Sequence, residues 1–339
     1  MFVNTMRNRR NFKKLAVVGA LLLLFGCSQP GGADGVRPPE GTPPGQLVAA
    51  GTNYVHSYDL AAGGNWNARF EYSGPSAAVA VDEPRGELIM AFTAGSEFVT
   101  VSVYDAGTFA LKREFEIPVG DHASRVQAVA VTKDGRYLAL NLSETVDPVV
   151  VLWDLQTETE VYRGLRNVQR SSFVFTPNDE LLVPLHPLGE NPAALVAFRI
   201  ADLVASTDGN VAGTAVVTFT REEWGSGTLK PALSRDGSTL VYESQGSVWL
   251  IELDYEDGAL SNAFEPRRLT TGPEPSHGAA LSPTGSHIAF TVGTAHLAST
   301  YIVPTSAAEP ILIDRNSGAG SQYLLQANTL VDYVLAWLE

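Results

Sequence analysis

Short apolar stretches separated by polar turns recur along this chain of 339 residues. In "LSPTGSHIAF", residues 281–290, a small apolar stretch leads into Pro-Thr-Gly, and alternating apolar and polar positions follow. Alternation is typical of a strand, and Gly285 supplies the positive φ that a tight turn requires. The phrase therefore predicts two antiparallel strands joined by a turn, with Ile288 and Phe290 packed between neighbouring sheets.

Six versions of this phrase align on the turn. They are "AVAVDEPRGELIMAF" (78–92), "AVAVTKDGRYLAL" (128–140), "FVFTPNDELLVPL" (173–185), "PALSRDGSTLVYE" (231–243), "AALSPTGSHIAFT" (279–291) and "YLLQANTLVDYVLA" (323–336). The equivalent turn residues are Gly86, Gly135, Asp179, Gly237, Gly285 and Asn328, at intervals of 43 to 58 residues. A third strand and a more variable fourth strand follow most copies. This period predicts an all-β fold, a six-bladed β-propeller.

The ends of the repeat region are incomplete in complementary ways. Residues 46–60, "QLVAAGTNYVHSYDL", have the pattern of second and third strands, and residues 322–339 that of a first and a second strand. Joined in one blade, the N- and C-terminal strands would close the ring and leave no open sheet edge. A seventh blade is the alternative, if the ends form separate blades or if residues 207–220 form an extra hairpin.

An aromatic residue followed by Asp ends the third strand of several units. The pairs are Tyr58–Asp59, Tyr104–Asp105 and Trp153–Asp154. Because a ring of units needs equivalent packing and capping in each unit, a feature that recurs at one position is expected to be structural.

The first 26 residues differ from the repeats. Five basic residues and no acidic residue precede an apolar run of about twelve residues, which is too short to span a membrane and is typical of a secretory signal peptide. Residues 27–45 are rich in Pro and Gly, as in a flexible tether. We therefore expect a signal peptide at 1–26, a tether at 27–45 and a propeller domain at 46–339.

The phrase "LLFGC" at residues 23–27 resembles the bacterial lipobox, although Phe25 departs from the usual small or β-branched residue. The resemblance implies that Cys27, the only cysteine, becomes the mature N-terminus and carries acyl chains such as palmitate, which would anchor the chain to a membrane. We expect an exported lipoprotein, on the outer membrane of a Gram-negative host and otherwise on the cell surface. The alternatives are a free thiol after an ordinary signal peptide and an uncleaved anchor.

Charge excludes two classes of partner. Without residues 1–26 the chain has 18 basic and 37 acidic residues, a formal charge of −19. Nucleic acid and anionic lipid surfaces attract clustered Lys and Arg, so neither is expected as a partner. A monomer is expected.

Two kinds of repeat carry a family resemblance. Residues 233–244, "LSRDGSTLVYES", and 281–292, "LSPTGSHIAFTV", resemble the TolB-type, WD-like repeat, and residues 87–108 resemble the YVTN repeat of bacterial surface propellers. The resemblance extends over residues 46–339 and implies a propeller of the cell envelope. We expect it to act as a module that binds a protein, a peptide or a ligand. TolB-like proteins carry an N-terminal α/β domain where this chain has the tether, so their partners are not carried over.

Unrepeated loops lead into the first strand of each blade and would meet on one face around the central channel. They contain a partly basic, partly aromatic set of candidate binding residues: His122, Arg125, Arg170, Trp224, Lys230 and His277. Converging polar groups of this kind are typical of binding sites. His122 and His277 have a second interpretation, since the His at this loop of WD-type repeats commonly hydrogen-bonds within its own blade.

No catalytic motif with a defined spacing is present in the sequence, and no cofactor or metal is expected. The alternative is a lactonase-type or other propeller hydrolase that uses residues of the channel face, among them Asp121, Glu222, Glu223 and Glu274. A further alternative is a structural or adhesive surface propeller.

Overall fold

The computed structural model describes residues 37–51, 54–71, 78–82, 85–93, 97–119, 125–143, 148–165, 168, 173–185, 193–207, 209–219, 230–293, 298–329 and 331–339. Residues 35–339 form one compact unit, which contains every described residue. Cys27 and the predicted signal peptide lie outside the described residues.

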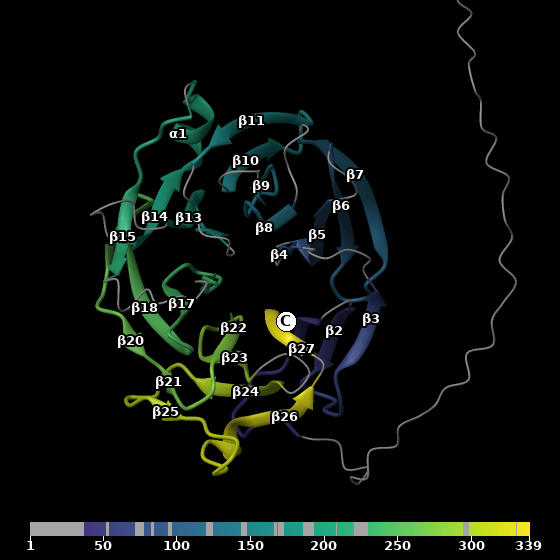
Figure 1. The fold of residues 1–339 in the computed structure, drawn as a ribbon, viewed down its shortest axis with the longest axis vertical. Helices are drawn as coiled ribbons and strands as arrows, with labels where there is room; N and C mark the ends of the chain where they lie inside the picture. Colours follow the sequence, from purple (N-terminus) through teal and green to yellow (C-terminus); the bar gives the residue numbers. More distant parts are fainter. Residues whose placement is uncertain are drawn as a thin grey trace, which may run out of the picture. The chain divides into compact units, whose positions relative to one another are not determined.

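Over these ranges, six antiparallel sheets follow one another around a central axis, as predicted (Figure 1). The first three blades are β4 (Ala78–Asp82), β5 (Glu87–Thr93), β6 (Phe98–Asp105) and β7 (Leu111–Pro118); β8 (Arg125–Val131), β9 (Tyr137–Ser143), β10 (Pro148–Asp154) and β11 (Thr159–Gly164); and β12 (Val174–Phe175), β13 (Glu180–Leu185), β14 (Ala193–Arg199) and β15 (Thr214–Phe219).

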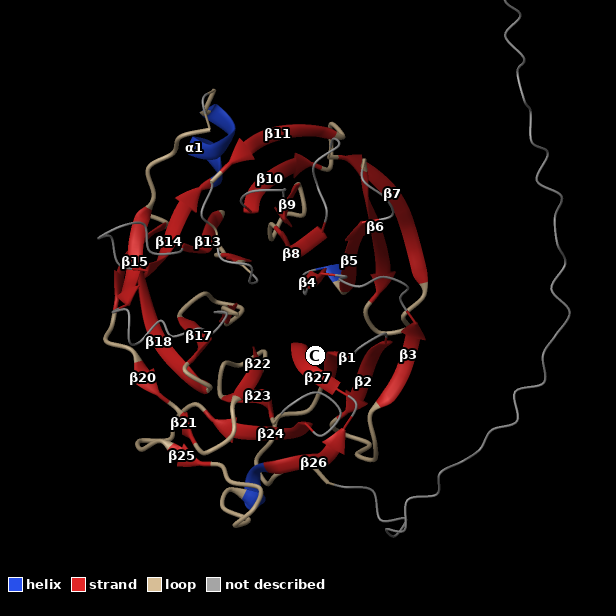
Figure 2. Cartoon of the chain, in the orientation of Figure 1, coloured by secondary structure: helices blue, strands red, loops and turns tan. Residues whose placement is uncertain are grey.

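The next three blades complete the ring. They are β16 (Ala232–Leu233), β17 (Thr239–Ser244) and β18 (Ser247–Glu256) with β19 (Ala259–Ala263) and β20 (Arg267–Arg268) both paired to β18; β22 (Ser276–Leu281), β23 (His287–Val292), β24 (Ala298–Pro304) and β26 (Leu324–Thr329); and β27 (Val331–Leu338), β1 (Gln46–Gly51), β2 (Tyr54–Asp59) and β3 (Asn67–Glu71). A short parallel pair is formed by β21 (Thr270–Thr271), which precedes β22 in sequence, and β25 (Ile311–Leu312), which lies between β24 and β26 in sequence. Strands dominate the described chain (Figure 2).

The first strand of each blade lies nearest the axis, as β4, β8, β22 and β27 do in Figure 1. Both sides of a blade are buried. Leu138 and Leu140 of β9 pack with the first blade, whereas the intervening Ala139 packs with the third. In the fifth blade, Ile288 and Phe290 are fully buried against the fourth blade, which confirms the prediction from their alternation. The core is thus a series of apolar layers between blades.

The repeated turn has one hydrogen-bonding pattern. In the fifth blade, Ser282 Oγ accepts from the His287 N–H at 3.0 Å and the Gly285 N–H donates to the Ser282 carbonyl at 2.8 Å. Gly285 has φ +68°, so the predicted left-handed turn is confirmed. In the fourth blade, Ser234 and Gly237 make the same two bonds. The phrase is recurrent because this turn needs a side-chain oxygen that accepts a backbone N–H and a residue with positive φ, which is Gly in most copies and Asp179 in the third blade.

The aromatic–Asp pairs cap the turn after the third strand. Asp59, Asp105 and Asp154 each use Oδ1 to accept the two backbone N–H groups found two and three residues later, at 2.8 to 3.2 Å. Tyr58 and Trp153 are buried in the packing between blades. The prediction of a structural role is confirmed.

The closing blade combines both ends of the domain, as predicted, but its strand assignment differs. Leu324–Thr329 is the outer strand of the fifth blade, paired with β24, and Val331–Leu338 is the first strand of the sixth blade, where Leu47 pairs with Trp337. The prediction that residues 322–339 supply a first and a second strand was wrong, because β1 already occupies the second position. Among the described side chains of β26, only that of Leu325 is fully buried, as is typical of an outer strand.

The longest interval between turns contains a helix instead of a seventh blade. Helix α1 (Ile200–Ala205) follows β14 and buries Ile200 and Leu203 against the second and third blades. Residues 214–219 then form β15, the outer strand of the third blade. The extra residues are therefore accommodated at the rim of the ring.

Candidate functional site

The first strands of the blades all run in one sense along the axis, so their starts share one face of the ring. We call this the channel face, and the opposite face, which carries the repeated turns, the turn face. Arg125 is the first residue of β8, Lys230 precedes β16 by two residues, and His277 is the second residue of β22. The structure thus places these three candidates on the channel face of three different blades. His122, Arg170 and Trp224 lie outside the described residues.

His277 is held at a β-bulge beside a buried carboxylate. The register of β22 against β23 shifts between His277 and Ala280, and Gly278 has φ +54°. Glu243, at the end of β17 in the preceding blade, accepts a hydrogen bond from the Gly278 N–H, and its other oxygen lies 3.9 Å from His277 Nδ1. Bulges of this kind redirect a side chain and are frequent beside functional sites.

The surroundings of His277 fix its backbone and leave its ring accessible. Its carbonyl accepts the Thr291 hydroxyl at 3.0 Å, and its side chain is 38% exposed, against 7% for Glu243. The imidazole can therefore contact a ligand, while Glu243 holds the bulge through its hydrogen bond with the Gly278 N–H. The carboxylate beside the His277 ring, Glu243, belongs to the neighbouring blade. The WD-type resemblance implied a hydrogen bond within one blade instead. Glu243 was missed from the sequence, where its only signal is an acid in the apolar strand "TLVYES".

A pocket of about 340 Å³ lies in the fifth blade. Its walls come from β24, from β26 and from the loop at residues 314–321, and include Ser299, Tyr301, Arg315, Asn316 and Leu324. This volume is near the lower end of the range for small-ligand sites, about 300–1,000 Å³. The sequence analysis did not identify the pocket, because its walls meet only when β26 returns to pair with β24.

Arg315 connects this pocket to the channel face. Its guanidinium makes two hydrogen bonds to Glu274, one of them at 2.8 Å, two residues before β22. It also lies over Gly293, at the entrance of the loop after β23, where a Cβ would meet the guanidinium at 3.0 Å. Glu274 was a candidate of the hydrolase alternative, and the structure shows it in this ion pair; Asp121, Glu222 and Glu223 lie outside the described residues.

Charges around the pocket influence Tyr301 and Asp314. Burial raises the pKa of Tyr301, with Arg315 opposing the rise and Glu274 adding to it. Hydrogen bonds from the Ser317 hydroxyl and the Asn316 N–H lower the pKa of Asp314. The Glu274–Arg315 hydrogen bond raises the pKa of Arg315. At neutral pH the pocket thus has a neutral phenol, a paired guanidinium and a carboxylate engaged in its own turn.

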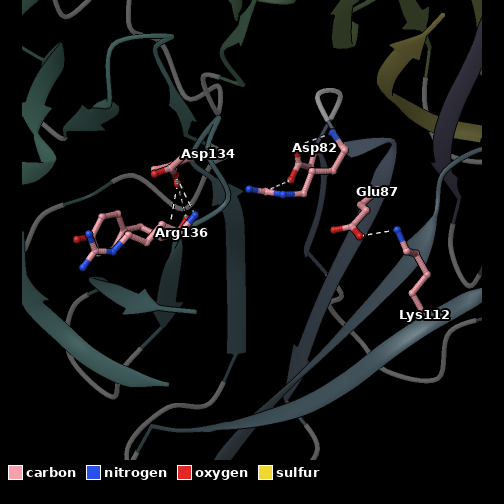
Figure 3. Close-up of polar contacts among 8 residues, drawn as sticks. Asp82, Glu87, Lys112, Asp134 and Arg136 are labelled. Atoms are coloured by element: carbon pink, nitrogen blue, oxygen red, sulfur yellow. Dashed lines mark hydrogen bonds and ion pairs between the residues drawn. The ribbon is translucent and has the colours of Figure 1, made fainter. Parts of the chain in front are cut away.

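The turn face has many charged side chains that pair with each other (Figure 3). Asp82 binds Arg85 and Glu87 binds Lys112 within the first blade, and Asp134 accepts from the Arg136 N–H in the second. The Arg85 guanidinium covers Gly135 of the next blade so closely that any Cβ there would overlap it. These contacts join neighbouring turns and indicate a structural role.

Two general features bear on the classes of site. Among the described residues, no group of three or more His, Cys, Asp and Glu side chains is arranged to hold a metal ion. No helix in the described part of the chain is long and apolar enough to cross a bilayer.

Solved structures similar to this chain include TolB from Acinetobacter baumannii, with a TM-score of 0.54 and 13% sequence identity. The match covers 86% of this chain and 66% of TolB, so this chain spans slightly less than two thirds of the length of TolB. A chain of a nidogen/laminin complex has a TM-score of 0.52 and 9% identity over 87% of this chain and 98% of that one. No protein-family profile matches the sequence, and no curated protein matches it. At these identities the likeness shows the fold, a β-propeller.

Proposed function

We propose that this chain is an exported, lipid-anchored β-propeller that binds a protein or peptide of the cell envelope on its channel face. The observation that carries the proposal is the position of Arg125, Lys230 and His277 at the starts of three inner strands. A basic set at one end of the axis is notable in a chain with a formal charge of −14. The propeller fold, which this chain shares with TolB, surrounds a central channel, and converging polar groups at such a concave position are typical of binding sites.

The geometry favours a partner segment that reaches toward the axis. Inner strands are the closest elements of neighbouring blades, so a loop or chain end at the channel mouth can meet groups from several blades at once. Arg125 and Lys230 would attract carboxylates of that segment, and His277 offers a partly exposed ring at a fixed backbone position. Charge complementarity of this kind mainly accelerates association and sets specificity.

The anchor and the tether would keep the ring close to a membrane. Acyl chains on Cys27 would hold the mature N-terminus, because each buried methylene contributes about 0.8 kcal/mol. The part of the predicted tether that precedes the compact unit, residues 27–34, would separate the propeller from the lipid surface. In fractionated cells a Cys27→Ala variant is expected to leave the membrane fraction, and its persistence there would contradict lipidation.

Affinity capture from envelope extracts tests the binding proposal. The parent chain and a double variant, Arg125→Glu with Lys230→Glu, are used as baits and the captured proteins compared by mass spectrometry. Lys133→Glu is the control, since it reverses one exposed cation on the turn face. A partner retained by the control and lost by the double variant would support the proposal; a partner retained equally by all three chains would refute this site.

A further inference from the structure

The proposed function does not use the pocket in the fifth blade. Tyr301 forms a rigid wall of it: its ring stacks on Phe290, with centroids 6.0 Å apart and planes inclined by 22°. Tyr301 as a whole is only 3% exposed. The wall is therefore preorganised, which reduces the entropy lost when a ligand binds.

Hydrogen-bonding groups of both kinds surround this wall. The Ser321 hydroxyl can donate and accept, the Asn316 amide supplies both functions in one plane, and the Arg315 guanidinium donates. Ser321 and Asn316 are exposed on the loop, and no hydrogen bond of the Asn316 side chain is found among the described residues. The lining suits a ligand that carries several closely spaced donors and acceptors.

Apolar surface completes the pocket. Leu324, Ala319 and Ala327 line it together with the Tyr301 ring. A ligand held here would present hydroxyls toward the loop and C–H groups toward these side chains. Sugar rings have this division between a hydroxyl edge and an apolar face.

Charge argues against an anionic ligand. The positive charge of Arg315 is matched by Glu274 through two hydrogen bonds. Asp314 adds a carboxylate, which accepts the Asn316 N–H at 2.9 Å. Phosphate or a carboxylate ligand would meet a site with no net positive charge, and it would have to compete with Glu274 for the guanidinium.

We propose that the pocket between β24, β26 and residues 314–321 binds a neutral, hydroxyl-rich ligand of one or two sugar rings. The pocket lies on the two outermost strands of the fifth blade, away from the candidate residues of the inner strands. The saccharide proposal therefore does not depend on the peptide-binding proposal. Arg315 and Glu274 link it to the channel face, so a glycan bound here would lie on the face that receives the partner.

Saccharide binding is tested with the full chain, purified in a detergent that has no sugar headgroup. Maltose, cellobiose and N,N′-diacetylchitobiose are the probes, with saturation-transfer NMR to detect contact and calorimetry to measure affinity. We expect one-site binding of at least one disaccharide. Ala327→Phe, which fills the pocket from an exposed position, and Asn316→Ala are each expected to weaken binding by about tenfold or more.

Gln322→Ala is the matched control, because Gln322 is exposed beside Ser321 but does not line the pocket. It should bind as the parent does. Unfolding midpoints of all variants are measured, and Asn316→Ala decides the test if Ala327→Phe fails to fold. Absence of binding by all three disaccharides would overturn the proposal, as would sugar binding that both pocket variants leave unchanged. Preferential binding of inorganic phosphate or of L-argininamide at the pocket would also overturn it. Loss of channel-face capture in the Arg125/Lys230 variant is independent of each of these outcomes.

Discussion

Removal of the Trp337 side chain should open the ring at the blade where the two chain ends meet. Trp337 is fully buried in β27 and packs with Leu47 of β1, Tyr58 of β2 and Ala289 of the fifth blade. Its Nε1 donates to the Pro44 carbonyl at 3.4 Å. One side chain thus contacts the first strands of the domain and the neighbouring blade.

Trp337→Ala is expected to lower the free energy of unfolding by about 3–5 kcal/mol, the usual cost of truncating a fully buried aromatic residue. That is a large part of a typical total of 5–15 kcal/mol. Urea unfolding followed by tryptophan fluorescence and by circular dichroism measures the change. Trp337→Phe retains most of the apolar volume and should lose clearly less.

Leu111→Ala is the control for truncation at the surface, because Leu111 is 54% exposed on the outer strand β7. Its change should stay within about 0.5 kcal/mol. A Trp337→Ala chain that unfolds within this margin of the control would refute the view that β27 closes the ring.

Two further predictions concern the repeated turn. Gly285→Ala should lower the free energy of unfolding by about 1–2 kcal/mol through its φ of +68° alone, since a Cβ there meets only Ser234 Cβ at 3.7 Å. Gly107 has no positive φ, so Gly107→Ala is the control. Equal urea midpoints for the two variants would contradict this reasoning. The Ser234 hydroxyl lowers the pKa of Asp236, so its stabilisation is fully present above the ordinary pKa of 3.8 and is lost as pH falls through the lower folded value. The stability difference between the parent and Asp236→Asn, measured by urea unfolding from pH 7 to pH 2, should therefore shrink below pH 4, and a constant difference would contradict the assignment.

The fold was largely predictable because the turn and the alternation are local. Gly285 and Ser282 make their turn from bonds within six residues, and Ile288 and Phe290 show their buried side by their spacing. The assignment of residues 322–339 failed for the opposite reason. Leu324–Thr329 and Val331–Leu338 are both apolar enough to be strands, and only their pairing with β24 and β1 distinguishes an outer strand from an inner one.

The candidate site was predictable only in part. Arg125, Lys230 and His277 were found because they stand in loops that depart from the repeat. Glu243 was not, since its partner Gly278 is 35 residues away in the next blade. The pocket that includes Arg315 and Tyr301 has no sequence signal at all, because its walls come from separate segments of the fifth blade.

The sequence by itself determined the period of the repeat and the turn chemistry, because both depend on interactions among neighbouring residues. The period favoured six blades, and the tertiary structure excluded the seventh. Tertiary structure decided which strand closes the ring, which carboxylate lies next to the His277 ring and where a pocket forms. Each of these depends on groups brought together from different blades or from distant segments of one blade. Such contacts are set by how the sheets pack around the axis, and the local pattern of apolar and polar residues does not encode that packing.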